Sequence, residues 1–179
     1  MADAAALPLP SFAALIGLRL SIVRRAADML VLHFGVVVPH RSGRGDVGQM
    51  AFHVEGPWRL DDAERTLVGR DDLWAFGGED PAPEGWSYED GGSVQDIRFS
   101  DLFERREGRY GWAVVDNGYL VSSADVTSTG DVKITFANGV SLLVFSDGVS
   151  RECWRLFDTG SDADHLVFPP DEQAWRSTR

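Results

Sequence analysis

Carboxylate side chains are concentrated in one part of this sequence, between residues 61 and 104. That stretch holds thirteen acids and three bases, whereas the other residues carry fifteen acids and fourteen bases. A dense negative surface can steer a basic protein toward it, and neighbouring carboxylates can bind a divalent cation. The doublets Asp61-Asp62 and Asp71-Asp72 suit the second chemistry, although adjacent acids in exposed turns are commonly only hydrated. The stretch could equally be a solvated connector that has no partner.

Aromatic residues lie among these acids. Trp86 and Tyr88 fall within 77–92, a segment rich in glycine and acids that is predicted to be a mobile loop. Large aromatic side chains within a charged rim are typical of protein interfaces. The predicted partner-binding residues are Asp71, Asp72, Glu79, Asp80, Glu84, Trp86, Tyr88, Glu89 and Asp90. Because the net charge is −11 and phosphate binding needs a basic footprint, we expect a basic protein partner and no nucleic acid.

Two arginines stand in matching surroundings, in Trp58-Arg59-Leu60 and in Trp154-Arg155-Leu156. On a strand, Trp and Leu share one face and the Arg between them points to the other. Arg59 and Arg155 could therefore bind an anion or a small ligand between two β units. The competing interpretation is structural, with buried tryptophans and with arginines that pair with neighbouring acids such as Glu152.

The remaining reactive side chains predict no chemistry. His33 and His53 could hold a metal together with Glu55, but no group of histidines and cysteines has ligand-like spacing. Cys153 lies in a predicted strand without a recognisable histidine partner, which favours a buried inert thiol. The sequence has no nucleophile elbow, phosphate-binding glycine loop or dinucleotide fingerprint. We therefore predict no catalytic residue, no metal and no cofactor.

The elements that must position these residues come as two similar units, 17–60 and 118–157. Each runs from a glycine through alternating stretches to a strand-like run and then to Trp-Arg-Leu. Such a repeat predicts two related β modules, joined by the acidic connector 61–104 within one domain that covers 1–179. The expected fold is β-dominated α+β, an antiparallel sheet or β-sandwich built from two pseudo-repeats.

Local patterns predict where the individual elements lie. A capping serine and a glycine stop predict a short N-terminal helix over 11–16, and Ser93 with Asp96 resembles a capping box before a helix over 94–106. Asn138-Gly139 predicts a type I′ hairpin. Alternating or β-rich runs predict strands at 18–23, 29–38, 49–55, 64–69, 119–125, 132–136, 140–145, 152–157 and 165–168.

Several of these residues carry a resemblance. Phe52-His53-Val54, Pro57-Trp58-Arg59-Leu60 and Glu152-Cys153-Trp154-Arg155-Leu156-Phe157 are similar to motifs of a group of small uncharacterised bacterial proteins, frequent in actinobacteria. The group carries no assigned chemistry that could be transferred. Its size and lack of catalytic signatures resemble immunity proteins that neutralise toxins, by analogy only.

These observations together predict a non-enzymatic, protein-binding module of the immunity type. The N-terminus lacks a basic secretory head, no apolar run is long enough for a membrane span, and the one cysteine suits a reducing compartment, so we expect a cytoplasmic location. The alternative is a small-molecule-binding or accessory domain of a bacterial defence or regulatory system. An enzyme of unrecognised type is the third hypothesis.

Overall fold

The computed structural model describes residues 11–43, 45–79, 81–105, 111–161 and 165–169. Every strand pair in this part of the chain is antiparallel, and β-structure dominates over one α-helix and short 3₁₀ turns. The predicted β-dominated α+β class is therefore confirmed. Among the described residues, no helix combines the length and the apolar character that crossing a bilayer requires.

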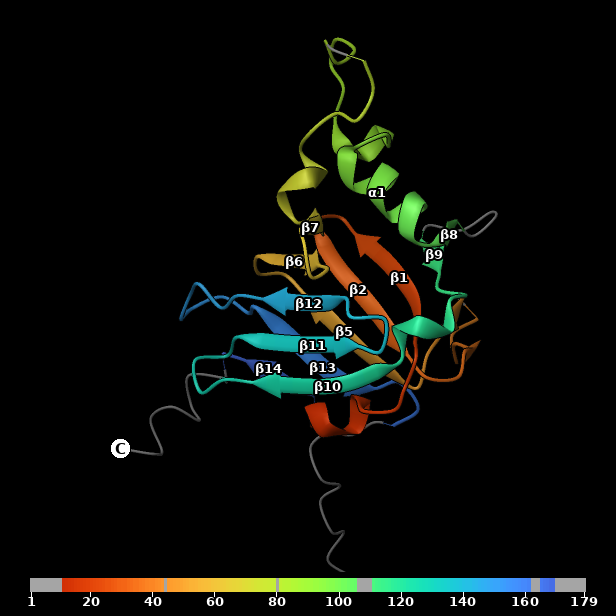
Figure 1. Cartoon of the computed structure of the whole chain (residues 1–179), viewed down its shortest axis with the longest axis vertical. Helices are drawn as coiled ribbons and strands as arrows, with labels where there is room; N and C mark the ends of the chain where they lie inside the picture. Colours follow the sequence, from red (N-terminus) through yellow and green to blue (C-terminus); the bar gives the residue numbers. More distant parts are fainter. Residues whose placement is uncertain (1–10, 44, 80, 106–110, 162–164, 170–179) are drawn as a thin grey trace, which may run out of the picture.

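Within the described ranges the strands form two large sheets and a small hairpin (Figure 1). The seven-stranded sheet has the order β14 (Leu166–Phe168), β13 (Trp154–Asp158), β5 (Met50–Val54), β2 (Met29–Phe34), β1 (Leu20–Ala26), β9 (Trp112–Ala113) and β8 (Glu104–Arg105). The five-stranded sheet has the order β10 (Val121–Val126), β11 (Val132–Phe136), β12 (Ser141–Val144), β6 (Trp58–Asp61) and β7 (Thr66–Gly69). The hairpin pairs β3 (Val38–Pro39) with β4 (Asp46–Val47).

The two sheets pack face to face around a shared core. In Figure 1, β10, β11 and β12 pass in front of β5 and β13 and run across them. Alternating residues of both sheets, such as Phe52 and Leu156 on one and Ile134 and Leu142 on the other, are fully buried in one hydrophobic cluster. Burial of these apolar side chains is the main driving force for holding the layers together.

Each of the two predicted units, 17–60 and 118–157, has its last strand in the sheet that holds the first strands of the other unit. The meander β1–β2–β5 is extended by β13, and the meander β10–β11–β12 is extended by β6. The registers correspond, because Trp154 lies opposite Val54 and Trp58 lies opposite Val144. Two duplicated units that exchange their last strands would give this pairing. The duplication itself stays a prediction.

The two tryptophans are both buried and both stacked on a phenylalanine. Trp58 stacks on Phe99 at 5.9 Å, and Trp154 stacks on Phe168 at 5.6 Å. Their indole N–H groups differ, since Nε1 of Trp154 donates to the carbonyl of Gly130 at 2.7 Å. Nε1 of Trp58 has no hydrogen-bond partner among the described residues.

Several predicted elements have different bounds in the structure. The predicted helix over 94–106 is α1 (Val94–Leu102), because Phe103 is extended (φ −138°, ψ 157°) and turns its side chain into the core. The predicted N-terminal helix is a single 3₁₀ turn, η1 (Phe12–Leu15). The strand predicted over 29–38 ends at Phe34, since Gly35 takes a φ of +83°.

The predicted type I′ hairpin between β11 and β12 is also corrected. Within the described chain, Ala27 is the only residue other than glycine with positive φ, so Asn138 does not have the conformation that type I′ requires. Gly139 alone is left-handed there, at φ +87°, and its N–H donates to the carbonyl of Phe136 at 3.0 Å. This is a three-residue turn that closes on a glycine bulge.

Candidate functional site

The main surface feature is a negatively charged segment that leaves the sandwich between β7 and α1. We call residues 71–92 the acidic arm. It contains seven acids and no lysine or arginine, and it extends beyond the sheets at the top of Figure 1. It begins with the 3₁₀ turn η2 (Asp71–Leu73) and ends just after η3 (Tyr88–Asp90).

Two aromatic pairs stabilise the arm from within. Trp74 meets Tyr88 edge to face at 4.8 Å between ring centroids, and Phe76 meets Trp86 in the same way at 5.2 Å. The backbone closes at the base of the arm, where the N–H of Gly77 donates to the carbonyl of Gly92 at 2.9 Å. The described residues of 77–92, predicted as a mobile loop, include the 3₁₀ turn η3. Trp86 in this segment packs edge to face on Phe76, and both rings are half-buried.

Capping boxes fix the starts of η3 and α1, which follow one another at the end of the arm. Ser87 caps η3 with Asp90, and Ser93 caps α1 with Asp96. In each box the serine hydroxyl accepts a backbone N–H while the acid accepts the N–H of the serine. The capping box predicted at Ser93 is confirmed, and Ser93 is fully buried.

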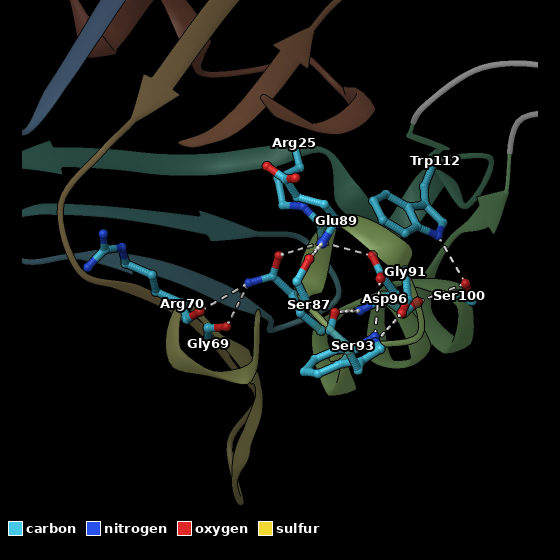
Figure 2. Close-up of polar contacts among 12 residues, drawn as sticks. Arg25, Gly69, Arg70, Ser87, Glu89, Gly91, Ser93, Asp96, Ser100 and Trp112 are labelled. Atoms are coloured by element: carbon cyan, nitrogen blue, oxygen red, sulfur yellow. Dashed lines mark hydrogen bonds and ion pairs between the residues drawn. The ribbon is translucent and has the colours of Figure 1, made fainter. Parts of the chain in front are cut away.

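Gln95 and Arg25 tie this end of the arm to the sandwich. Figure 2 shows Arg25 and its partner Asp96, and also Gly69 and Arg70, whose carbonyls Gln95 bonds. The buried amide of Gln95 donates to the carbonyls of Gly69 and Arg70 at 3.0 and 3.3 Å. Its oxygen lies 3.5 Å from Arg25 on β1. Arg25 also forms an ion pair with Asp96 at 2.8 Å and lies over the Tyr88 ring at 5.9 Å from the centroid.

A cleft of about 580 Å³ opens between this end of the arm and the edge of the seven-stranded sheet. We call it the arm cleft. Its charged and aromatic lining residues are Arg25, Tyr88, Glu89, Asp90, Asp96, Arg105 and Trp112. Trp112 is 6% exposed and donates its indole N–H to Ser100 at 3.1 Å, which fixes the ring as part of the wall. The cleft thus combines carboxylates, two guanidinium groups and aromatic rings.

The structure distributes the nine predicted partner-binding residues over the arm. Tyr88, Glu89 and Asp90 line the arm cleft. Asp71 lies in η2, Glu79 and Glu84 are exposed further along, and Asp80 lies outside the described residues. Four of the nine make side-chain contacts within the protein. Asp72 accepts the N–H of Gly69 at 2.8 Å, and Asp90 accepts the N–H of Ser87 at 2.8 Å. The indole N–H of Trp86 donates to Gly91 at 2.9 Å, and Tyr88 packs on Trp74.

Arg59 and Arg155 do not converge on a common site. They lie on strands of different sheets, and in each strand the flanking Trp and Leu are buried while the Arg faces away from the core. Arg59 bonds Asp61 at 2.7 Å and lies over Phe145. Arg155 binds both oxygens of Glu152 at 2.5 and 2.6 Å, and this hydrogen bonding raises the pKa of its guanidinium. The predicted pairing of Arg155 with Glu152 is confirmed.

His53 lies beside Arg155 on the outer face of the seven-stranded sheet. Burial, followed by the charge of Arg155, lowers the pKa of His53 to about 4.

The other residues considered for a metal site lie in separate contacts. His33, on the neighbouring strand β2, pairs with Ala51, and Glu55 forms an ion pair with Arg151 at 3.6 Å. Within the described ranges, no three His, Cys, Asp or Glu residues gather as a metal site would require. Cys153 is buried, and burial raises the pKa of its thiol.

Sequence reasoning missed the residues that the chain brings to the arm cleft from a distance. Arg25 comes from β1, Arg105 from β8 and Trp112 from β9. No local motif surrounds any of the three, and the short strands β8 and β9 have no alternating pattern long enough to detect. Trp74, which is 50% exposed at the start of the arm, lies inside the acidic stretch and could have been included with Trp86.

Comparisons with protein-family models, with curated proteins and with solved structures found no match for this chain.

Proposed function

We propose that this protein is a non-enzymatic module that binds a basic protein partner through its acidic arm. The observation that carries the proposal is the run of seven acids without a base on a segment that extends from the sandwich. Such a surface raises the association rate with a positively charged partner and selects against negatively charged ones, nucleic acid included. An immunity-type role in the cytoplasm, where the partner would be a toxin or effector domain, is the form of this function that the sequence resemblance favours.

Exposed apolar side chains on the arm and next to it support a protein interface over a purely hydrated surface. Trp74 is 50% exposed, and Ile97 on the outer side of α1 is 42% exposed. Tryptophans are frequent among residues that dominate binding energy, especially where a polar rim excludes water around them. Charge would then set the rate of encounter, and Trp74 would supply apolar contact once the partner has docked.

The test compares two triple variants with the wild-type protein as bait in a lysate of the native host. The arm variant combines Glu79→Gln, Glu84→Gln and Glu89→Gln. The control variant removes three exposed carboxylates elsewhere, by Glu64→Gln, Asp125→Asn and Asp147→Asn. The identified partner is then purified, and its association rate is measured against salt concentration. We expect the arm variant alone to associate about tenfold more slowly and with a weaker salt dependence.

Two results would count against the proposal. One is the lack of any captured protein whose binding depends on the arm. The other is that the arm variant, the control variant and the wild type all associate with the partner at the same rate. The alternative of a ligand site near Arg59 and Arg155 gains no support, because both guanidinium groups bond a neighbouring carboxylate on separate sheets.

A further inference from the structure

The floor of the arm cleft carries a charge pair that neutralises itself. Arg25 and Asp96 are 2.8 Å apart, and their side chains are only 17% and 18% exposed. The oxygen of Gln95 adds a second, longer contact to Arg25 at 3.5 Å. Because the guanidinium of Arg25 is already compensated on two sides, it neither attracts an anionic ligand strongly nor repels a cationic one strongly.

The rim of the cleft, in contrast, offers open carboxylates. The Glu89 side chain has no hydrogen bond or ion pair with any other described residue. Asp90 uses one oxygen to accept the N–H of Ser87 at 2.8 Å, which leaves its second oxygen available. Both of these exposed acids line the arm cleft, so a single cationic group in the cleft could approach both.

Aromatic surface lies next to these carboxylates. Tyr88 precedes them in η3 and lines the cleft together with Trp112. The Trp112 indole N–H is bonded to Ser100, and the ring, which is 6% exposed, contributes a small apolar part of the cleft wall. Carboxylates next to aromatic rings match the guanidinium group of arginine, which bonds carboxylates through two parallel N–H groups and stacks on rings. A lysine ammonium has neither a planar group that stacks on rings nor two parallel N–H donors.

We propose that the arm cleft receives an arginine side chain from the basic partner, with its guanidinium on Glu89 and Asp90 and its stem against Tyr88 and Trp112. The inference rests on the proposed function and names the chemical group that the arm recognises. The cleft volume of about 580 Å³ lies within the range of ligand pockets, about 300–1,000 Å³, and leaves room for backbone on either side of the arginine. Arg105, on the same cleft, can bond a carbonyl of that backbone.

The first experiment titrates Nα-acetyl-L-arginine amide into the ¹⁵N-labelled full chain and follows the indole N–H of Trp112 and the side-chain amide of Gln95. The matched probe is Nα-acetyl-L-citrulline amide, which has the same shape without the charge. We expect saturable shifts at both reporters with the arginine probe and a dissociation constant about tenfold higher with the citrulline probe. Equal affinity for the two probes, or shifts that never saturate, would overturn the inference.

The second experiment places the binding on Glu89 and Asp90. The double variant Glu89→Gln/Asp90→Asn keeps an oxygen acceptor for the Ser87 N–H, and Glu79→Gln/Glu84→Gln removes the same charge outside the cleft. We expect the first pair to weaken the arginine probe about tenfold and the second by less than twofold. Equal effects of the two pairs would reject the cleft as the site.

The outcome also separates this inference from the proposed function. If the arginine probe binds but no partner whose binding depends on the arm is captured, the proposed function is rejected and the arginine site in the arm cleft is retained. If a partner binds through the arm and its affinity is unchanged by Glu89→Gln/Asp90→Asn, the arginine site in the arm cleft is rejected and the proposed function is retained.

Discussion

At the scale of single residues, Gln95 shows how a buried amide can hold a charged surface in place. It is 2% exposed, it donates to two backbone carbonyls at the end of β7, and its oxygen faces Arg25. Replacing it by an apolar side chain of similar size would leave those carbonyls buried without a donor, and an unsatisfied buried polar group costs more than the lost bond itself.

We therefore expect Gln95→Leu to lower the free energy of unfolding by about 1–3 kcal/mol, measured by urea denaturation followed by circular dichroism. Gln49→Leu is the matched control, because Gln49 is exposed and its side-chain oxygen accepts one N–H, that of Val36. Its effect should stay within about 0.5 kcal/mol. Equal losses in the two variants would show that the Gln95 contacts contribute nothing specific.

His53 gives the protein a pH dependence whose sign follows from its surroundings. Burial, Arg155 and His165 lower its pKa from 6.5 to about 4 in the folded state, while Glu152 opposes the shift. Between these two values the unfolded chain binds a proton that the folded protein does not. Stability from this residue is therefore complete above about pH 6.5 and is lost as the pH falls toward 4.

The expected result is that wild type loses about 2 kcal/mol more stability than His53→Gln between pH 6.5 and pH 5. Urea denaturation of both proteins across this range measures the difference, and the carboxylates contribute little to it because they titrate lower. A titration of the His53 ring protons by NMR should give a midpoint near 4. Parallel stability curves, or a midpoint near 6.5, would contradict the interpretation.

At the scale of elements, the turn between β11 and β12 depends on one glycine. Gly139 has a φ of +87°, and a side chain there would meet no atom within 4 Å, so an added methyl group is strained by conformation and not by a clash. A residue other than glycine in this region costs about 1–2 kcal/mol. Gly148, in the following loop, also has open space but does not have a left-handed φ.

Gly139→Ala should consequently destabilise the protein by about 1–2 kcal/mol, while Gly148→Ala should be neutral or stabilise it by up to about 1 kcal/mol. Thermal unfolding of the two variants beside wild type measures both effects. If the two substitutions behave alike, the left-handed conformation of Gly139 does not matter to stability.

The elements also show where sequence patterns suffice and where they fail. The run at 132–136 has a clear period of two, and there the predicted strand matches β11. The helix predicted over 94–106 begins where α1 begins, but α1 ends at Leu102. Helical spacing could not reveal the end of α1, because Phe99, Leu102 and Phe103 are all apolar. Tertiary packing decides it, since Phe103 contacts Tyr119 at 5.1 Å from an extended backbone.

At the scale of the whole molecule, the same contrast holds for the site. The acidic arm could be predicted because charge density is visible along the sequence. The arm cleft could not, because Arg25 and Trp112 join Tyr88 only through the pairing of β9 with β1 and through the packing of α1 on the sandwich. Predicting it would have needed the pairing of β9 with β1, two strands that are far apart in the sequence.

The exchange of β6 and β13 between the two sheets affects how the protein unfolds. Since β13 pairs with β5 and β6 pairs with β12, neither half of the chain holds a complete sheet by itself. A defect in one sheet must then weaken both. Leu142 on β12 offers a way to test this. It is fully buried, and its backbone pairs only with strands of the five-stranded sheet, opposite Leu60 on β6 and Ile134 on β11.

We expect Leu142→Ala to cost about 2–5 kcal/mol and to lower the hydrogen-exchange protection of β5 and β13 as much as that of β11 and β12. Unfolding curves from circular dichroism and tryptophan fluorescence should keep a common midpoint. The neighbouring Leu143→Ala is the control, since Leu143 is half-buried on the opposite face and should cost less than half as much. Protection that falls in the five-stranded sheet while β5 and β13 keep theirs would mean that the sheets unfold separately, in spite of the strands they exchange.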